Sequence, residues 1–171
     1  ATCDAVVALI HKETGMEEVN PGMFGADERK ALVELLKAGI ARGKSNDVTL
    51  HLLGGAKARR LIVIGLGNIK KFSLECLREA GVALARAMTA QKVKSAALVV
   101  PVLPDGLGGM PGAEPVQPAL PRAVEALAEG FLLGRFHLEQ YKGSASPKDK
   151  TPNAHLTLVT GVNGRTEAAL S

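Results

Sequence analysis

The sequence predicts an α/β sandwich in which helices cover a mixed, largely parallel β-sheet. Short apolar runs alternate along the chain with longer segments of helical periodicity, the order typical of such sheets. The 171 residues suit one domain, since domains usually contain about 100–150 residues. The composition, with 46% hydrophobic and 22% charged residues, is that of a globular protein, and it excludes a disordered, collagen-like or coiled-coil chain.

The first expected elements are a strand and a helix. Residues 5–10 form a continuous apolar run rich in β-branched side chains, which is typical of a buried strand. After a turn at Asn20-Pro-Gly22, apolar residues recur at helical spacing from Asp27 to about Ala41. Acidic residues favour the start of this helix, and we expect Gly43 at its exit.

Two strands and a second helix follow. Residues 47–53 alternate between apolar and polar side chains, and residues 60–65 are again apolar, so the two segments could pair as a hairpin. Ser73 is expected to cap a helix that continues to about Thr89. Residues 96–102 then predict another buried strand.

The last part of the chain contains the longest loops. A Gly/Pro-rich loop spans residues 103–121, and a helix is expected from Arg122 to about Leu133. A polar surface loop at 142–153 precedes a strand at 155–159. Residues 166–170 indicate the start of another helix, and the chain begins at Ala1 rather than Met, so we expect residues 1–171 to be one domain of a longer protein.

Charge and cysteine content restrict the partners. The formal net charge is +4, and the cations are scattered, which favours a solvated surface over a nucleic-acid site. Aromatic residues make up 3% and Trp is absent, which argues against a protein that stacks single-stranded bases. No run of about 20 apolar residues predicts a membrane span. The two cysteines, Cys3 and Cys76, suggest a reducing cytoplasm.

Two glycine motifs superficially match phosphate-binding turns. Gly65-Leu-Gly67 follows a strand, but Lys70 stands where a third glycine is needed, so a tight turn that requires small residues is the favoured interpretation. Gly39 to Ser45 approximates a P-loop, but three residues replace the required four and the motif follows a helix. This second motif is interpreted as a helix C-cap beside a cation.

The loop at 103–112 is a third candidate, because it follows a buried strand. The glycines from Gly106 to Gly112 could let backbone N–H groups approach a pyrophosphate, although Asp105 would repel it. A flexible connection between two elements is the favoured interpretation.

No catalytic or metal-binding set can be assembled from the sequence. The histidines at 11, 51, 137 and 155 share no ligand spacing with Cys or carboxylates, and no nucleophile elbow is present. Cys76 lies near the apolar face of its expected helix and is interpreted as a packing residue. We therefore assign no catalytic, cofactor-binding or metal-binding residue.

Two blocks carry a resemblance to a known family. Residues 60–86 contain a strand that ends in Gly65-Leu-Gly67, then a helix with Leu77-Arg-Glu-Ala-Gly81 and a tail of small residues. Residues 128–142 contain Glu129-Gly130, then aromatic residues and Tyr141-Lys142. In order and spacing the two blocks resemble the N-terminal domain of the leucine (cytosol) aminopeptidases, over most of the chain.

The resemblance implies a macro-domain-like three-layer sandwich that precedes a catalytic domain. In that family two divalent metals, zinc, manganese or magnesium, lie in the catalytic domain, within motifs such as Asn-Thr-Asp-Ala-Glu-Gly-Arg. These 171 residues lack that motif, so no ligand is carried over. The family also implies a cytoplasmic hexamer that acts on peptides, with the N-terminal domain contributing to contacts between subunits, and some bacterial members bind DNA.

Three functions follow as expectations. The leading one is the non-catalytic N-terminal domain of a di-metal leucyl aminopeptidase, with a structural and assembly role and no peptidase activity of its own. The second is a free-standing macro-like module that binds an ADP-ribose-type nucleotide through Gly106 to Gly112. The third is a DNA-binding accessory domain, which predicts a steep salt dependence of affinity.

Overall fold

A six-stranded sheet forms the centre of the protein. The structure is a computed structural model that describes residues 3–14, 24–54, 58–100, 119–136, 154–159 and 168–170. Within this part of the chain the strand order is β2-β3-β1-β4-β5-β6. The bounds of the strands are β1 Ala5–Ile10, β2 Val48–Leu52, β3 Arg60–Gly65, β4 Ser95–Val99, β5 His155–Val159 and β6 Ala168–Leu170.

The pairing of the strands confirms a mixed, largely parallel sheet. β1 pairs in parallel with both β3 and β4, and β4 pairs in parallel with β5. The two edge strands, β2 and β6, run antiparallel to their neighbours. The predicted hairpin of residues 47–53 and 60–65 is therefore confirmed, with Leu50 opposite Ile62.

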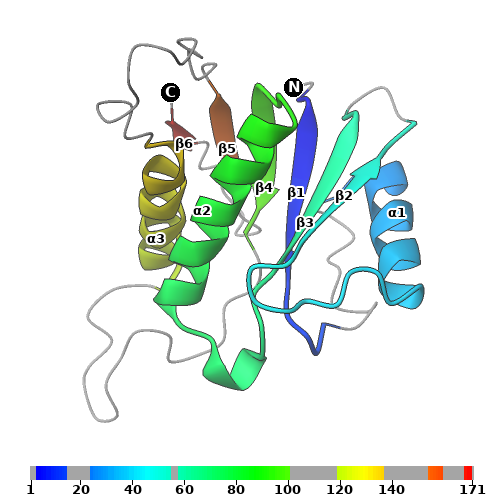
Figure 1. Ribbon diagram of the computed structural model, residues 1–171, viewed down its shortest axis with the longest axis horizontal. Helices are drawn as coiled ribbons and strands as arrows, with labels where there is room; N and C mark the ends of the chain where they lie inside the picture. The colour runs from blue at the N-terminus through cyan, green and yellow to red at the C-terminus, as the bar shows by residue number, and fades with distance from the viewer. Residues whose placement is uncertain are drawn as a thin grey trace, which may run out of the picture.

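Helices cover both faces of the sheet and complete the three predicted layers. The helices are α1 (Ala26–Lys37), α2 (Leu74–Ala90) and α3 (Ala119–Arg135), with a short 3-10 turn, η2, at Ile69–Lys71. In Figure 1, α2 and α3 lie side by side in front of the sheet. α1 packs against the opposite face, where Leu32 and Leu35 meet β1 and β3.

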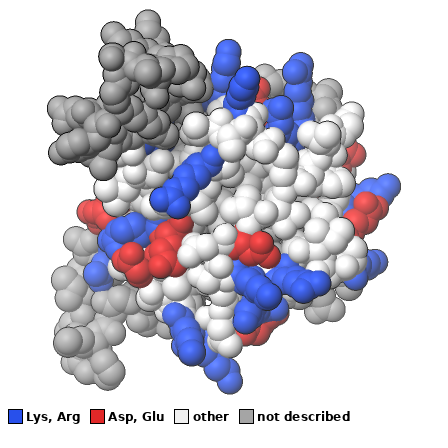
Figure 2. Space-filling model, in the orientation of Figure 1, with Lys and Arg blue, Asp and Glu red and all other residues white. Residues whose placement is uncertain are grey.

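Charged side chains are intermingled on the face that carries α2. Figure 2 shows blue and red atoms interspersed among white ones, with no continuous basic surface in this view. This agrees with the scattered charges of the sequence. No helix among the described residues has the length and apolar character needed to cross a membrane.

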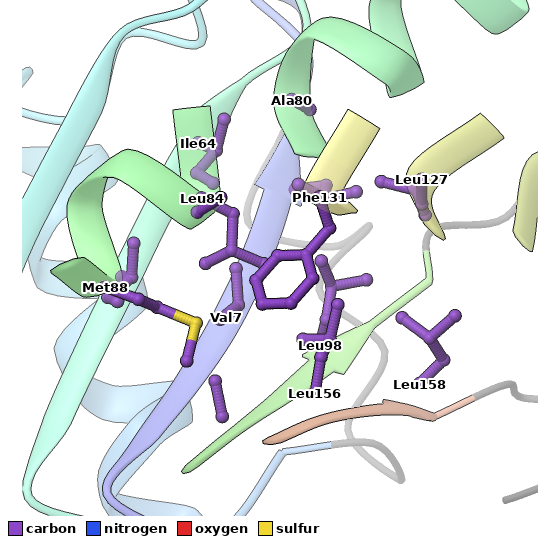
Figure 3. Close-up of a cluster of buried hydrophobic side chains, with 14 of the residues drawn as sticks. Val7, Ile64, Ala80, Leu84, Met88, Leu98, Leu127, Phe131, Leu156 and Leu158 are labelled. Carbon is purple, nitrogen blue, oxygen red and sulfur yellow. The ribbon is translucent and has the colours of Figure 1, made fainter. Parts of the chain in front are cut away.

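The larger core lies between the sheet and the α2–α3 pair. Successive residues of β1 point to opposite faces, so that Val7 and Leu9 meet α2 and α3 while Ala8 and Ile10 meet α1. Figure 3 shows the ring of Phe131 among Leu84 of α2 and Leu98 of β4. Phe131 is 1% exposed, and its burial ties α3 to the middle of the sheet.

The first helix ends earlier than the sequence indicated. α1 ends at Lys37, and the glycine at its exit is Gly39, with φ of +65°, rather than Gly43. The N–H of Ile40 donates to the carbonyl oxygen of Leu35 (3.0 Å), and the N–H of Gly39 donates to that of Leu36 (3.0 Å). These two bonds form a Schellman motif, which closes the helix at a left-handed residue that only glycine adopts easily.

The ends of the other two helices also differ in detail. Ser73 is the N-cap of α2, as predicted, but its side chain makes no capping hydrogen bond. α3 begins at Ala119, about one turn before the expected Arg122. The first turn of a helix tolerates Pro121, because an N–H there has no partner within the helix.

The end of the chain contradicts the prediction. Residues 166–170 were expected to begin a helix, but Ala168–Leu170 form β6, which pairs antiparallel with β5 and places Leu170 opposite Leu156. The sequence of this stretch has helical propensity, but an available edge of β5 provides a ladder of backbone hydrogen bonds, and such tertiary context overrides a weak local preference.

Candidate functional site

In sheets of this kind, ligands bind where the parallel strands end. The four parallel strands β1, β3, β4 and β5 have their carboxyl ends at the same end of the sheet. At that end of the sheet the structure describes residues 11–14 after β1 and residues 66–73 between β3 and α2. The loop of Gly106 to Gly112, which follows β4, lies outside the described residues, and its proposed contact with a pyrophosphate stays a prediction.

Two glycines, one at the end of β3 and one in the turn that follows, are needed for close packing. A Cβ atom on Gly65 would lie 1.9 Å from the carbonyl oxygen of Lys44, and Gly67 has φ of +82°. The N–H of Gly67 donates to the carbonyl oxygen of Gly43 (2.9 Å), which holds the two segments together. Since any side chain at Gly65 would push the backbone of residues 43–44 away, the predicted tight turn is confirmed.

The same turn uses its backbone donors internally. The N–H of Leu66 donates to the carbonyl oxygen of Ile10 (2.8 Å), and the N–H of Ile69 to Glu13 Oε2 (3.0 Å). The N–H of Lys70 donates to Asn68 Oδ1 (2.8 Å). A phosphate-binding turn presents free N–H groups to its ligand. Here a carboxylate already lies where an anion would bind, so this turn serves the fold.

The motif from Gly39 to Ser45 is also structural. Its first glycine closes α1, which confirms a helix C-cap in place of a P-loop. Gly43 has φ of +62°, and a Cβ atom on it would lie 2.3 Å from the carbonyl oxygen of His11. Both glycines are therefore required by backbone geometry, and neither lies at the start of a helix, where a P-loop would bind phosphate.

The described histidines and cysteines are dispersed. The ring of His11 is buried and meets Phe72 edge-on, with 4.8 Å between the ring centres. Cys76 is half-buried on α2, with its sulfur 3.6 Å from Ser73 Oγ. Burial raises the pKa of the Cys3 thiol, which lowers its reactivity at neutral pH. In the parts of the chain that the structure describes, no three His, Cys, Asp or Glu side chains come together as a metal site.

Residues from both blocks of the family resemblance meet at the contact between α2 and α3. A Cβ atom on Gly130 would lie 1.9 Å from the carbonyl oxygen of Arg78, and one on Gly81 would lie 2.5 Å from that of Leu127. One turn later, a Cβ atom on Gly134 would lie 2.8 Å from the carbonyl oxygen of Val82. The glycines therefore allow the two helix backbones to touch.

Arg78 joins the two helices at the same level. Its Nε and Nη2 atoms donate to Glu129 Oε2 at 2.9 and 2.8 Å, and its Nη1 donates to Glu75 on its own helix. Hydrogen bonds to Glu129 and then to Glu75 raise the pKa of Arg78. Arg78, Gly81, Glu129 and Gly130 are thus one packing unit. The sequence showed the two blocks but could not show that they meet, because 51 residues separate Arg78 from Glu129.

Comparisons with known proteins point in one direction. The model of the N-terminal domain of the cytosol aminopeptidase family matches residues 23–145. A probable cytosol aminopeptidase of Koribacter versatilis is 34% identical over 144 residues, which cover 79% of this chain and 26% of that protein. A second, from Roseiflexus castenholzii, is 31% identical over 140 residues, 81% of this chain and 26% of that protein. The chain thus spans about a quarter of the length of these relatives.

Solved structures agree on the fold. A tomato leucine aminopeptidase mutant has a TM-score of 0.64 at 18% identity, covering 97% of this chain and 31% of that one. A bottromycin maturation enzyme determined with manganese has a TM-score of 0.58 at 21% identity, covering 94% of this chain and 27% of that one. At these identities the likeness concerns the fold alone.

Proposed function

The chain belongs to the cytosol aminopeptidase family, as its N-terminal domain, and from this premise we propose that it is the non-catalytic structural and assembly domain of a di-metal leucyl aminopeptidase. The observation that supports this most directly is the packing role of four residues from the two blocks of the family resemblance. Arg78, Gly81, Glu129 and Gly130 all serve the contact between α2 and α3, which fixes the fold and leaves none of the four at a ligand site.

The chemistry of the parent enzyme is proposed for residues outside this chain. Two divalent metals in a catalytic domain would polarise the scissile carbonyl and activate a water molecule. The described residues do not fit such a centre, since no cluster of three metal-ligating side chains occurs among them. We therefore derive no step of peptide hydrolysis from this chain.

The partners and location of the parent are proposed from its relatives. The length of those relatives supports a C-terminal catalytic domain as the covalent partner. A cytoplasmic hexamer that acts on the N-termini of peptides is the assembly we propose, and the word cytosol in the names of the relatives supports the location.

A direct activity assay tests the proposal. The purified 171-residue chain should release no product from a leucyl chromogenic substrate in the presence of added manganese. A version extended through the native reading frame beyond Ser171 serves as the control and should be active. Product release by the short chain alone, at a rate proportional to its concentration, would contradict the proposal.

A binding assay tests the nucleotide alternative. If the domain has only the proposed structural role, calorimetry of the 171-residue chain with ADP-ribose should show no binding heat at millimolar ligand. Saturable heat that disappears when Gly106 to Gly112 are replaced would instead establish a nucleotide module. DNA binding that weakens steeply with salt would establish the third function.

A further inference from the structure

The edge strand β2 exposes an apolar row. Its side chains Val48, Leu50 and Leu52 are 38%, 38% and 71% exposed, and no residue of β2 carries a charge. Soluble proteins usually protect the edge of a sheet with charges, proline or a covering element, because an unprotected edge pairs with other strands. β2 lacks charge and proline, so it is suited to pairing with a further strand.

Among the described residues, Val48, Leu50 and Leu52 also have backbone N–H and C=O groups that do not bond to β3. The N–H of Gly65 donates to the carbonyl oxygen of Asp47 (2.9 Å), and the N–H of Leu53 donates to that of Arg59 (2.9 Å). Hydrogen bonding between antiparallel strands repeats every second residue, so the backbone N–H and C=O groups of the odd-numbered residues of β2 point toward β3. Val48, Leu50 and Leu52 therefore direct their backbone groups away from the sheet.

A groove between β2 and α2 adds to this surface. It has a volume of about 660 Å³, and its apolar lining comes from Val48, Leu50, Val82, Ala83, Ala87 and Ala90. In Figure 2, mostly white atoms cover the surface to the right of α2, in the direction of β2. α2 therefore covers the centre of the sheet but leaves the apolar side of β2 open.

We propose that β2 pairs antiparallel with β2 of a second copy of this chain, about a two-fold axis at Leu50. The sequence of β2, Val-Thr-Leu-His-Leu, suits this arrangement, because the axis places Val48 opposite the second copy's Leu52 and Thr49 opposite the second copy's His51. Each apolar residue then meets an apolar residue, as a two-fold interface requires. The outward groups of Val48, Leu50 and Leu52 would form about six backbone hydrogen bonds.

Charge complementarity supports this register. In the pair, Asp47 of one copy lies opposite Leu53 of the other, and Leu53 is bonded to Arg59 on its other side. Asp47 and Arg59 are both exposed, and their positions lie on the same face of the extended sheet. With neighbouring strands about 4.8 Å apart, the long Arg59 side chain can reach across Leu53 to the Asp47 carboxylate, and symmetry forms this contact twice.

The inference rests on the proposed assembly role and names the surface that would perform it. The contact is small, so we expect the isolated chain to associate weakly, with a Kd on the order of 100 μM. Sedimentation equilibrium should show a reversible dimer of the 171-residue chain. A chain that remains monomeric at about 1 mM would overturn the inference, whereas the proposed function fails by a different result, peptidase activity of the chain alone.

Charge reversal tests the register. Asp47→Arg and Arg59→Asp should each weaken the dimer about tenfold, because each brings like charges together at both symmetric contacts across Leu53. The double variant should restore it, a result that misfolding cannot produce. Leu133→Lys, at a 61% exposed leucine of α3, is the matched control and should leave association unchanged. Weaker association of the Leu133→Lys control, or a double variant that associates no better than the single variants, would overturn the inference.

Cross-linking tests the axis. In a background of Cys3→Ser and Cys76→Ser, Leu50→Cys should form a disulfide-linked dimer on mild oxidation, since directly opposed residues have Cα atoms about 5.5 Å apart, within disulfide range. Val48→Cys should cross-link efficiently only when mixed with Leu52→Cys. Equal cross-linking of all three variants with themselves would show random encounter and overturn the proposed pairing.

Discussion

The two faces of the sheet are covered in different ways. On one face α2 and α3 lie backbone to backbone, with glycines at their contact and most of the buried apolar side chains beneath them. On the other face the single helix α1 rests on a small cluster around Leu32 and Leu35. Gly81, Gly130 and the Arg78–Glu129 pair, which belong to the two blocks of the family resemblance, lie on the first face. The comparison teaches that the family pattern marks the place where the fold tolerates least change.

The largest effect is expected at Gly130. Gly130→Ala would place a Cβ atom 1.9 Å from the carbonyl oxygen of Arg78 on the other helix, so the helices must separate. We expect a loss of more than about 4 kcal/mol in the free energy of unfolding, measured by urea denaturation. Gly54→Ala is the matched control, because no atom lies within 4 Å of its Cβ position. Equal stability of the two variants would contradict the close packing of α2 and α3.

Paired leucine truncations compare the two faces directly. Leu127→Ala, on the sheet-facing side of α3, should lower the free energy of unfolding by about 4–5 kcal/mol. Leu35→Ala, on the sheet-facing side of α1, should lower it by about 3 kcal/mol, since the loss grows with the cavity that neighbours cannot fill. Leu127 is fully buried in the larger cluster, and Leu35 is 6% exposed in the smaller one. Thermal and urea unfolding of both variants measure the difference. A larger loss at Leu35 would reverse the comparison.

Asp4, the residue before β1, is hydrogen-bonded to the start of β4, and this contact should make the stability depend on pH. The N–H of Lys94 donates to its Oδ2 (2.9 Å), as does that of Ser95 (3.1 Å), and these bonds lower the pKa of Asp4. A lowered pKa stabilises the fold above the ordinary pKa of the unfolded chain, and this contribution is lost as the pH falls through the folded-state pKa. Asp4→Asn should cost about 1 kcal/mol at neutral pH.

The pH dependence of unfolding provides the control for this effect. Unfolding of the Asp4→Asn variant should vary less with pH in the acid range than unfolding of the unchanged chain. Parallel curves for the two proteins would show that Asp4 contributes nothing to the pH dependence.

The smallest effect is expected at the ion pairs of Arg78. The side chain of Arg78 is 34% exposed and that of Glu129 47%, so solvent screens their attraction. Glu129→Gln, which breaks the link between helices, should lower the Tm slightly, and Glu75→Gln, within one helix, should lower it less. Both differences should shrink in high salt. A drop comparable to that of Gly130→Ala would show that the charges, rather than the glycines, hold the two helices together.

Local patterns predicted most of the elements. The apolar run at residues 5–10 and the helical spacing after Ser73 identified β1 and α2, because burial and periodicity are recorded in neighbouring residues. The small residues at Gly65 and Gly67 correctly indicated a tight turn. These signals need no knowledge of distant parts of the chain.

Features that depend on distant contacts were missed. The sequence predicts Gly43 at the end of α1, whereas the structure shows that the carbonyl of His11, more than 30 residues earlier in the chain, leaves no room for a Cβ atom on Gly43. Ala168–Leu170 suited a helix until the edge of β5 was known. The meeting of Arg78 with Glu129 likewise needs the packed helices. Local sequence alone contains none of these pairings.

The position of β1 has a consequence for the synthesis of the protein. β1 is the first strand of the described chain, yet it lies in the middle of the sheet, between β3 and β4. Asp4 bonds to Ser95, which is 91 residues away. A growing chain on the ribosome therefore holds β1 without its second neighbour until β4 has emerged, and such distant pairing slows folding. A protease that removed residues 5–10 would not trim an edge but would split the sheet between its two halves.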